Sequence, residues 1–192
     1  MYKRVTLRDT VEVPPEYLAD VTPELVKRLL QDKLEGRVDE DVGSVVSVVD
    51  IHDIGEGAVV PNEPGVYYEA EFDAVTFDPQ MQEVVDGEIV EVVNFGAFVG
   101  IGPVDGLLHV SQISDEYLAY DEEGQMLAAR ESNRTVGAGD SVRARIVTKS
   151  IDERNPRDSK IGLTAKQVGL GKHGWLKEER EKRKTQAEAG EN

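Results

Sequence analysis

The sequence predicts two domains: an α+β domain in which one main helix covers a small antiparallel sheet, followed by an all-β barrel. Three observations lead to this prediction. An amphipathic segment with helix-boundary residues lies near the N-terminus, strand-like segments follow it, and after Pro79 the hydrophobic pattern is that of strands alone. The length of 192 residues is that of two small domains.

The main helix is predicted to begin at Pro23 and to end at Gly36. Thr22 is a favoured N-cap residue, and proline is tolerated at the first helical position because its missing N–H has no partner there. Glycine is common just beyond a helix C-terminus. One face of the segment is apolar and contains Val26, Leu29, Leu30 and Leu34.

Two strands of the first domain are recognised by composition and alternation. The segment Gly43–Asp53 is rich in valine, which favours strands. The segment Val66–Asp73 alternates between apolar and polar residues, so one side faces a core. The core-facing residues are predicted to be Val66, Tyr68, Ala70 and Phe72. Glycines and prolines between the two segments predict a loop.

A domain boundary is predicted near Pro79, because proline forces the preceding residue into an extended conformation. The predicted strands beyond it are Gly87–Val93, Ala97–Ile101, Gly106–His109, Ser141–Lys149 and Lys160–Thr164, the strand number of a small Greek-key barrel. A long segment, Ser114–Val136, interrupts them and is expected to be functional or partly ordered. The predicted domains are residues 1–80 and 82–166, followed by a C-terminal extension, 167–192.

The C-terminal extension contains the charged segment Glu178–Lys184. Charges four residues apart support a short helix, which we expect to fray into a partly disordered tail. Its basic residues could contact RNA or a protein partner, but a solvated helix is the simpler interpretation.

Four segments in the second half resemble the S1 domain of the OB-fold class, in the order that this class has. They are Val85–Val99, Asp105–Ser111, Gly139–Ile146 and Lys160–Thr164. The resemblance spans residues 82–166 and implies binding of single-stranded RNA on the outer face of the middle strands.

Aromatic rings on such a face bind bases by stacking. Phe95, Phe98 and His109 are the rings available at the matching positions. Residues three apart in a strand point to opposite faces, so Phe95 and Phe98 can share the RNA face only if the strand bulges. We therefore predict a bulge at Gly96. A core position for Phe95 or Phe98, and a purely structural role for His109, are the alternatives.

Cations are predicted to complete the RNA face. In the segment from Ser141 to Lys149, Val142, Ala144 and Ile146 are predicted to point inward. Arg143 and Arg145 then point outward as phosphate or base contacts, and Lys160 alternates with apolar neighbours and also faces out. Asp152 falls where S1 domains often have a polar residue on this face. Ordinary solvated strand residues are the alternative for both arginines.

The net charge of −16 is unusual for a nucleic-acid binder, because affinity for RNA usually comes from Lys and Arg. Either the protein avoids nucleic acid, or it works in molar salt, where the Debye length is about 3 Å. We favour the second interpretation, a halophilic protein, because acidic residues are scattered through both halves of the chain. RNA binding in such a solvent would depend on stacking and hydrogen bonds.

Nothing in the sequence indicates catalysis. It has no cysteine, and its three histidines are far apart, so we expect neither a metal nor a cofactor. The Gly169–Gly174 segment fits a dinucleotide-binding pattern, but too little chain follows it for a βαβ unit, and we interpret it as a turn. No segment has the length and apolarity of a signal peptide or membrane span, so we expect a cytoplasmic protein without membrane contact.

Several segments resemble the larger stalk subunit of archaeal DNA-directed RNA polymerase, the E-prime family. They are Met1–Val5, Asp41–Gly43, Ile51–Gly57, Tyr67–Pro79, Glu83–Gly87, Gly102–Gly106, Ile161–Thr164 and Leu170–Lys172 with Trp175. The resemblance implies a non-catalytic protein with a ribonucleoprotein-like N-terminal domain and an S1 domain. It also implies contact with the polymerase core, a smaller helical stalk subunit and nascent RNA.

For contact with the polymerase core we select Gly55, Gly57 and Pro64, because glycines allow close approach of a partner's backbone. A plain turn is the alternative for each of these residues. Two other functions stay open: a stand-alone S1 protein of translation or RNA decay, and a structural spacer that holds the polymerase without touching RNA.

Overall fold

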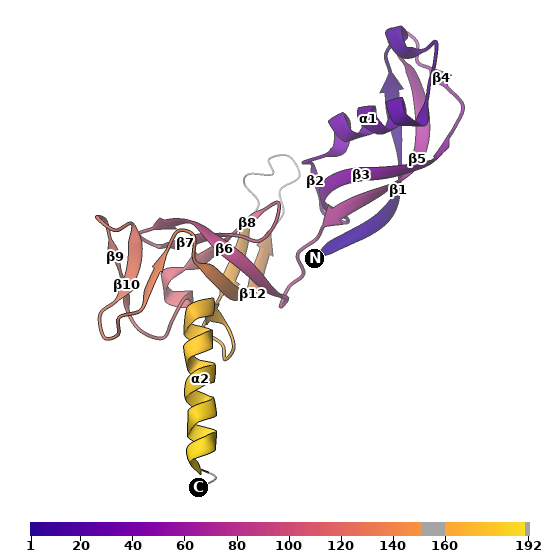
Figure 1. The fold of residues 1–192 in the computed structure, drawn as a ribbon. Helices are drawn as coiled ribbons and strands as arrows, with labels where there is room; N and C mark the ends of the chain where they lie inside the picture. The colour runs from indigo at the N-terminus through magenta and orange to yellow at the C-terminus, as the bar shows by residue number, and fades with distance from the viewer. Residues whose placement is uncertain (151–159, 191–192) are drawn as a thin grey trace. The chain divides into compact units, whose positions relative to one another are not determined.

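The computed structural model describes residues 1–150 and 160–190, with side chains up to residue 186. Figure 1 shows two compact units. The first comprises Met1–Asp78, and the second comprises Pro79–Ser150 and the described residues from Lys160 on. The fold class is confirmed, with a helix on an antiparallel sheet followed by a closed barrel.

The first unit contains a five-stranded antiparallel sheet in the order β1-β5-β3-β2, with β4 also pairing with β5. Its strands are β1 (Tyr2–Val13), β2 (Val38–Asp39), β3 (Gly43–Ile54), β4 (Ala58–Val59) and β5 (Val66–Phe77). A short 3-10 helix, η1 (Pro15–Tyr17), and α1 (Pro23–Leu34) lie between β1 and β2. The predicted loop between β3 and β5 thus includes the short strand β4.

Helix α1 forms where the sequence predicts it. The Thr22 hydroxyl accepts a hydrogen bond from the Leu25 N–H at 3.3 Å, which satisfies one of the free donors of the first turn. Val26 and Leu30 are fully buried against the sheet, where Phe72 is also buried. Burying each of these side chains stabilises the unit by about 1.5 to 3 kcal/mol.

Strand β1 is absent from the sequence prediction, although it is one of the longest strands. It pairs with β5 over its whole length, from Tyr2 opposite Phe77 to Val13 opposite Val66. Arg4, Thr6 and Arg8 lie on the sheet face away from α1, where Arg4 forms an ion pair with Asp73 at 2.7 Å. Asp9 lies on the other face and forms an ion pair with Lys33 of α1 at 2.7 Å. The alternation of basic and apolar residues near the N-terminus was the signal that could have predicted this strand.

The second unit contains a barrel in which the strand order is β13-β8-β7-β6-β12 and β12 also pairs with β13. Its strands are β6 (Val84–Val93), β7 (Gly96–Gly100), β8 (Asp105–His109), β12 (Ser141–Ser150) and β13 (Lys160–Thr164). These positions match the five predicted strands within a few residues. The barrel interior includes Ile89, Val99, Leu108, Ile146 and Leu163, all at most 1% exposed.

The long segment between β8 and β12 is ordered in the structure. After the 3-10 helix η2 (Val110–Gln112) it forms a three-stranded sheet of β9 (Leu118–Asp121), β10 (Met126–Ala129) and β11 (Thr135–Gly137). Leu127 and Val136 are buried in this insertion sheet. Its strands of four residues or fewer were too short for the sequence to show a clear period.

The described C-terminal residues form β14 (Gly171–Lys172) and α2 (His173–Gly190), the yellow helix of Figure 1. Trp175 and Leu176 in the first turn of α2 are each 8% exposed. The Arg134 guanidinium lies 5.0 Å from the Trp175 ring centroid and forms an ion pair with Glu179 at 3.2 Å. The start of α2 is therefore attached to the insertion sheet. No helix in the described parts of the chain is long and apolar enough to cross a membrane.

Candidate nucleic-acid interface

The candidate interface is the outer face of β7, β8 and β13. Phe98 lies opposite Leu107 on β8, and Leu107 lies beside Gly162 on β13. The residues that alternate with them, including Ala97 and Leu108, are buried in the barrel. Because successive side chains point to opposite faces, Phe98, Leu107 and Gly162 form a row on the outside.

Phe95 also lies near this face, but its position does not depend on the predicted bulge. The strand has no bulge at Gly96; the register shift lies instead in β6, between Ile89 and Glu91. Phe95 belongs to the two-residue turn between Val93 and Gly96, so strand alternation does not govern its direction. The predicted bulge at Gly96 is thus wrong, because Phe95 lies in the turn and not in the strand.

The two phenylalanine rings nevertheless meet. Their centroids lie 6.4 Å apart with an angle of 85° between the ring planes, an edge-to-face contact. The Phe95 carbonyl accepts a hydrogen bond from the Val110 N–H at 2.9 Å, which fixes the turn against η2. Gly96 is needed for close approach, because a Cβ there would lie 2.9 Å from the His109 Cα. Phe95 is 46% exposed, and Phe98 is half-buried.

His109 lies at the end of β8 with an exposed side chain. Its Nδ1 accepts a hydrogen bond from the Ser111 N–H at 3.2 Å and lies 2.8 Å from the Ser111 hydroxyl oxygen. In the neutral ring that accepts at Nδ1, the proton lies on Nε2. The capping role of His109 therefore fixes the ring and leaves an N–H donor at its far side.

Lys160 begins β13 and is exposed. It stands two residues before Gly162, whereas His109 stands two residues after Leu107 on the parallel neighbouring strand. The two side chains thus lie on the same outer face, separated by about four residues of strand rise, roughly 13 Å. The structure brings Phe98, His109 and Lys160 to one side of the barrel.

Arg143 and Arg145 point outward from β12, between the buried residues Val142, Ala144 and Ile146, as predicted. Strand β12 adjoins β6, β13 and β14 but neither β7 nor β8, so β13 separates its outer side chains from the rings on one side and β6 on the other. Lys160 lies on β13, which belongs to the candidate face, whereas both arginines lie on the neighbouring strand β12. Asp152 lies outside the described residues.

Both arginines are engaged within the chain. The Arg143 guanidinium donates to both carboxylate oxygens of Asp86, from Nε at 2.7 Å and from Nη2 at 2.9 Å. These two hydrogen bonds and the His173 ring hold the pKa of Asp86 at about 2, and Asp86 raises the pKa of Arg143. Arg145 donates from Nε to the Gln167 side-chain oxygen at 2.7 Å.

The residues selected for contact with the polymerase core lie at the loop between β3 and β5. Gly55 is held by a hydrogen bond from its N–H to the Glu69 carbonyl at 2.8 Å, and Pro64 is exposed. A Cβ at Gly57 would lie 2.8 Å from the Tyr68 ring and from the Val66 side chain, so a larger residue there would require these side chains to shift. Val59 and Val60, which the sequence argument did not select, are 74% and 38% exposed at the same loop.

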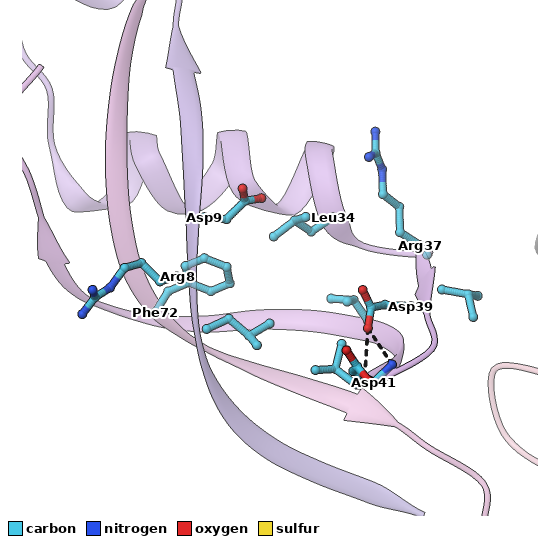
Figure 2. A pocket seen from close by; sticks show the side chains of 12 residues that line it. Arg8, Asp9, Leu34, Arg37, Asp39, Asp41 and Phe72 are labelled. Carbon is cyan, nitrogen blue, oxygen red and sulfur yellow. Dashed lines mark hydrogen bonds between the residues drawn. The ribbon is translucent and has the colours of Figure 1, made fainter. Parts of the chain in front are cut away.

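A groove of about 780 Å³ in the first unit lies where α1 ends beside β2 and β3. Figure 2 shows Leu34, Arg37 and Phe72 among the residues that line it. The Asp39 carboxylate accepts hydrogen bonds from the Asp41 N–H at 2.8 Å and the Val42 N–H at 3.0 Å. Among the described residues, no cluster of three or more His, Asp or Glu side chains is placed to hold a metal ion.

Two family descriptions match the two units. Residues 8–65 match the "SHS2 domain found in N terminus of Rpb7p/Rpc25p/MJ0397", and residues 78–160 match the "S1 RNA binding domain". The chain thus belongs to the class of two-domain proteins that join an SHS2 domain to an S1 RNA-binding domain.

Full-length relatives define the family within this class. The chain is 36% identical over 180 residues to the DNA-directed RNA polymerase subunit Rpo7 of Sulfolobus acidocaldarius, covering 93% of this chain and 97% of the relative. Identity to the Rpo7 subunit of Saccharolobus shibatae is also 36%, over 92% of this chain and 97% of the relative. The chain belongs to the family of DNA-directed RNA polymerase subunit Rpo7, and the resemblance found in the sequence is confirmed.

The S1 unit alone has a wider set of relatives. Ribonuclease R of Escherichia coli is 35% identical over 95 residues, which are 48% of this chain and 12% of the ribonuclease. That similarity reaches only a small part of the enzyme. It therefore supports an S1-type barrel and does not extend to the rest of the ribonuclease.

Proposed function

We propose that this chain is the larger, non-catalytic stalk subunit of a DNA-directed RNA polymerase and that it contacts nascent single-stranded RNA through its S1 barrel. The observation that carries the proposal is the match over 97% of an Rpo7 subunit, combined with exposed rings on one outer face of the barrel. The subunit would support initiation and elongation by holding the transcript and positioning the polymerase, without catalytic residues of its own.

The RNA face in this proposal consists of Phe95, Phe98, His109 and Lys160. Stacking on an aromatic ring contributes about 1 to 3 kcal/mol per base, and every base has a face that can stack. Lys160 supplies a positive charge for a phosphate, and the His109 Nε2 supplies a donor. Arg143 and Arg145 stay predicted contacts on the neighbouring strand β12, but RNA would have to compete there with Asp86 and Gln167.

The anionic surface fits a halophilic, cytoplasmic protein. At a net charge of −16, long-range forces would repel RNA at low ionic strength. In molar salt the Debye length falls to about 3 Å, so that repulsion is screened while stacking persists. An RNA face built on rings is therefore suited to such a solvent.

Two protein contacts complete the proposal. The loop that contains Gly55, Gly57 and Pro64 would insert into the polymerase core, and the exposed side chains of Val59 and Val60 favour this because they offer apolar surface at its tip. A smaller helical stalk subunit would form a heterodimer with this chain. A stand-alone S1 protein, the rival function, needs no such partners.

The test is affinity purification of the chain at high salt, followed by mass identification of the proteins retained. Recovery of a small helical subunit in equal amount, together with polymerase core subunits, supports the proposal. A free monomer with neither partner would contradict the stalk role. In parallel, RNA crosslinking is compared between the wild type and a triple variant, F98A, H109A and K160A; equal crosslinking would favour a structural spacer.

A further inference from the structure

We propose that Tyr117 and Arg130 of the insertion sheet form an additional stacking site for a base of single-stranded RNA, an inference that rests on the proposed function. Tyr117 is 69% exposed, the highest exposure among the aromatic side chains that the structure describes. The guanidinium carbon of Arg130 lies 5.2 Å from the centroid of this ring. The site lies outside the β7, β8 and β13 face.

The backbone fixes this pair. Leu118, which follows Tyr117, pairs with Ala129, which precedes Arg130, so Tyr117 and Arg130 are the next neighbours beyond the end of the β9–β10 ladder. Ile113 and Leu118 on either side of Tyr117 are 3% and 5% exposed. The Ala129 N–H also donates to the Arg134 carbonyl at 2.9 Å. The pairing and the buried neighbours hold the exposed Tyr117 ring in place. Less conformational entropy is therefore lost when a base stacks on the ring.

The charges around the pair leave the arginine available. Glu116, next to Tyr117, is engaged by the Ser132 hydroxyl at 2.5 Å. Within the described part of the chain, no carboxylate forms an ion pair with Arg130, although Arg4, Arg8, Arg134 and Arg143 all have one. A guanidinium that covers one ring face and has no carboxylate partner can contact a phosphate while a base stacks on the open face.

The position of the pair allows one RNA to reach both sites. Tyr117 follows His109 by eight residues, so the two Cα atoms are at most about 29 Å apart. The intervening η2 is tied to β13 by a hydrogen bond from the Thr164 hydroxyl to the Gln112 side-chain oxygen at 2.8 Å. OB folds bind about 4 to 16 nucleotides, and the longer part of that range would span both sites.

A second pair of the same kind provides a matched control. Arg28 lies 5.8 Å from the Tyr17 ring centroid in the first unit. Tyr17 is half-buried, unlike Tyr117. The Arg28→Gln variant removes an equivalent cation from an equivalent pair far from the insertion in sequence, so it should leave RNA binding unchanged.

The experiment measures binding of the full chain to uridine oligonucleotides of about 5 and about 15 nucleotides in 1 M KCl. We expect Tyr117→Ala to raise the Kd for the longer RNA about fivefold or more and to leave the Kd for the shorter one unchanged. Tyr117→Phe should retain wild-type affinity, whereas Tyr117→Leu, which keeps apolar bulk without a ring, should weaken binding as Tyr117→Ala does. Arg130→Gln should weaken binding of the longer RNA, in contrast to Arg28→Gln.

Three results would overturn the inference. One is wild-type affinity of both Tyr117→Ala and Tyr117→Leu for the longer RNA, while Phe98→Ala weakens both RNAs; the proposed function would then survive without this site. Another is an equal loss on both RNAs in Tyr117 variants that keep the wild-type melting temperature, because Tyr117 would then belong to the site that the shorter RNA already fills. The third is unchanged RNA binding with weaker retention of a protein partner, which would assign the pair to a protein interface. Failure of the wild type to bind either RNA would reject the proposed RNA contact itself.

Discussion

The rings of Phe95 and Phe98 meet edge to face at 6.4 Å, one from a hairpin turn and the other from the strand that follows it. The contact gives the S1 barrel a paired aromatic surface beside His109 without any irregularity in β7. Phe98 is the more buried member of the pair and belongs to the row that continues through Leu107.

Replacing Phe98 by alanine should weaken RNA binding by about 1 to 3 kcal/mol, because one stacking platform is lost and Phe95 loses its neighbour. The measurement is fluorescence anisotropy with a labelled uridine oligonucleotide in molar salt. Val84→Ala is the matched control, since Val84 is a 40% exposed apolar residue at the start of β6. Equal affinity of both variants would argue against the ring face.

Lys160→Gln should lower the salt dependence of RNA binding. One lost phosphate contact reduces the slope of log K against log salt by about 0.7 for a single strand. Arg143→Gln should change the slope less, because the Arg143 guanidinium is already engaged by both Asp86 oxygens. Titrations between about 0.2 and 2 M KCl would separate the two variants. A larger effect at Arg143 would place the RNA path on β12 instead.

Gly96→Ala should destabilise the second unit by about 1 to 3 kcal/mol, because the new Cβ would press on β8 at the Leu108 carbonyl and the His109 Cα. Gly174→Ala is the control, since no atom lies within 4 Å of a Cβ built there and alanine favours the helix. Urea unfolding followed by circular dichroism gives both values. A neutral Gly96→Ala variant would mean that β7 and β8 can separate without cost.

Much of this architecture could be predicted from local sequence. Thr22, Pro23 and the apolar face of α1 specify the helix by short-range rules, and the S1 segments specify five strands. The rings at Phe95 and Phe98 could be selected, but their geometry could not, because a shift of one residue in a hairpin turn changes how a side chain points. Pairing partners such as Asp86 for Arg143 depend on strand order, which the local pattern does not contain.

The missed elements have physical reasons too. Strand β1 has a polar face made of arginines and threonines, and those side chains find partners on β5 only after the sheet forms, as Thr6 does with Asp73 at 2.7 Å. The insertion strands are so short that their stability depends on burying Leu127 and Val136, a tertiary effect. Exposure of Val59 and Tyr117 likewise depends on the folded surface.

The loop between β3 and β5, which exposes Val59 and Val60, should contribute to polymerase binding through apolar contact. Val59→Asp would place a charge where a partner surface excludes water, and we expect retention of the core subunits to fall about tenfold or more. Because Val59 is 74% exposed in the free chain, the variant should keep the thermal stability of the wild type. Co-purification measures the retention of the core subunits, and a melting curve on the same preparation measures thermal stability. Loss of stability together with binding would instead indicate a role in the fold of the loop.

The ion pair between Asp86 and Arg143 should make acid stability depend on Asp86. The hydrogen bonds from Arg143 lower the pKa of Asp86 from its usual value near 3.8 to about 2 in the folded protein. A carboxyl whose pKa is lower in the folded state stabilises it above the unfolded pKa, and this contribution disappears as the pH falls from about 4 to about 2. Because the Asp86 side chain is 52% exposed, screening by solvent limits the contribution to about 1 kcal/mol or less.

Asp86→Asn should therefore be less stable than the wild type at pH 6, and the difference in unfolding free energy should shrink as the pH approaches 2. Urea unfolding of both proteins across this range measures that difference, with Glu88→Gln on the same strand as the control for a general loss of negative charge. A difference that stays constant with pH would show that the two hydrogen bonds between Arg143 and Asp86 stabilise the barrel independently of the protonation of Asp86.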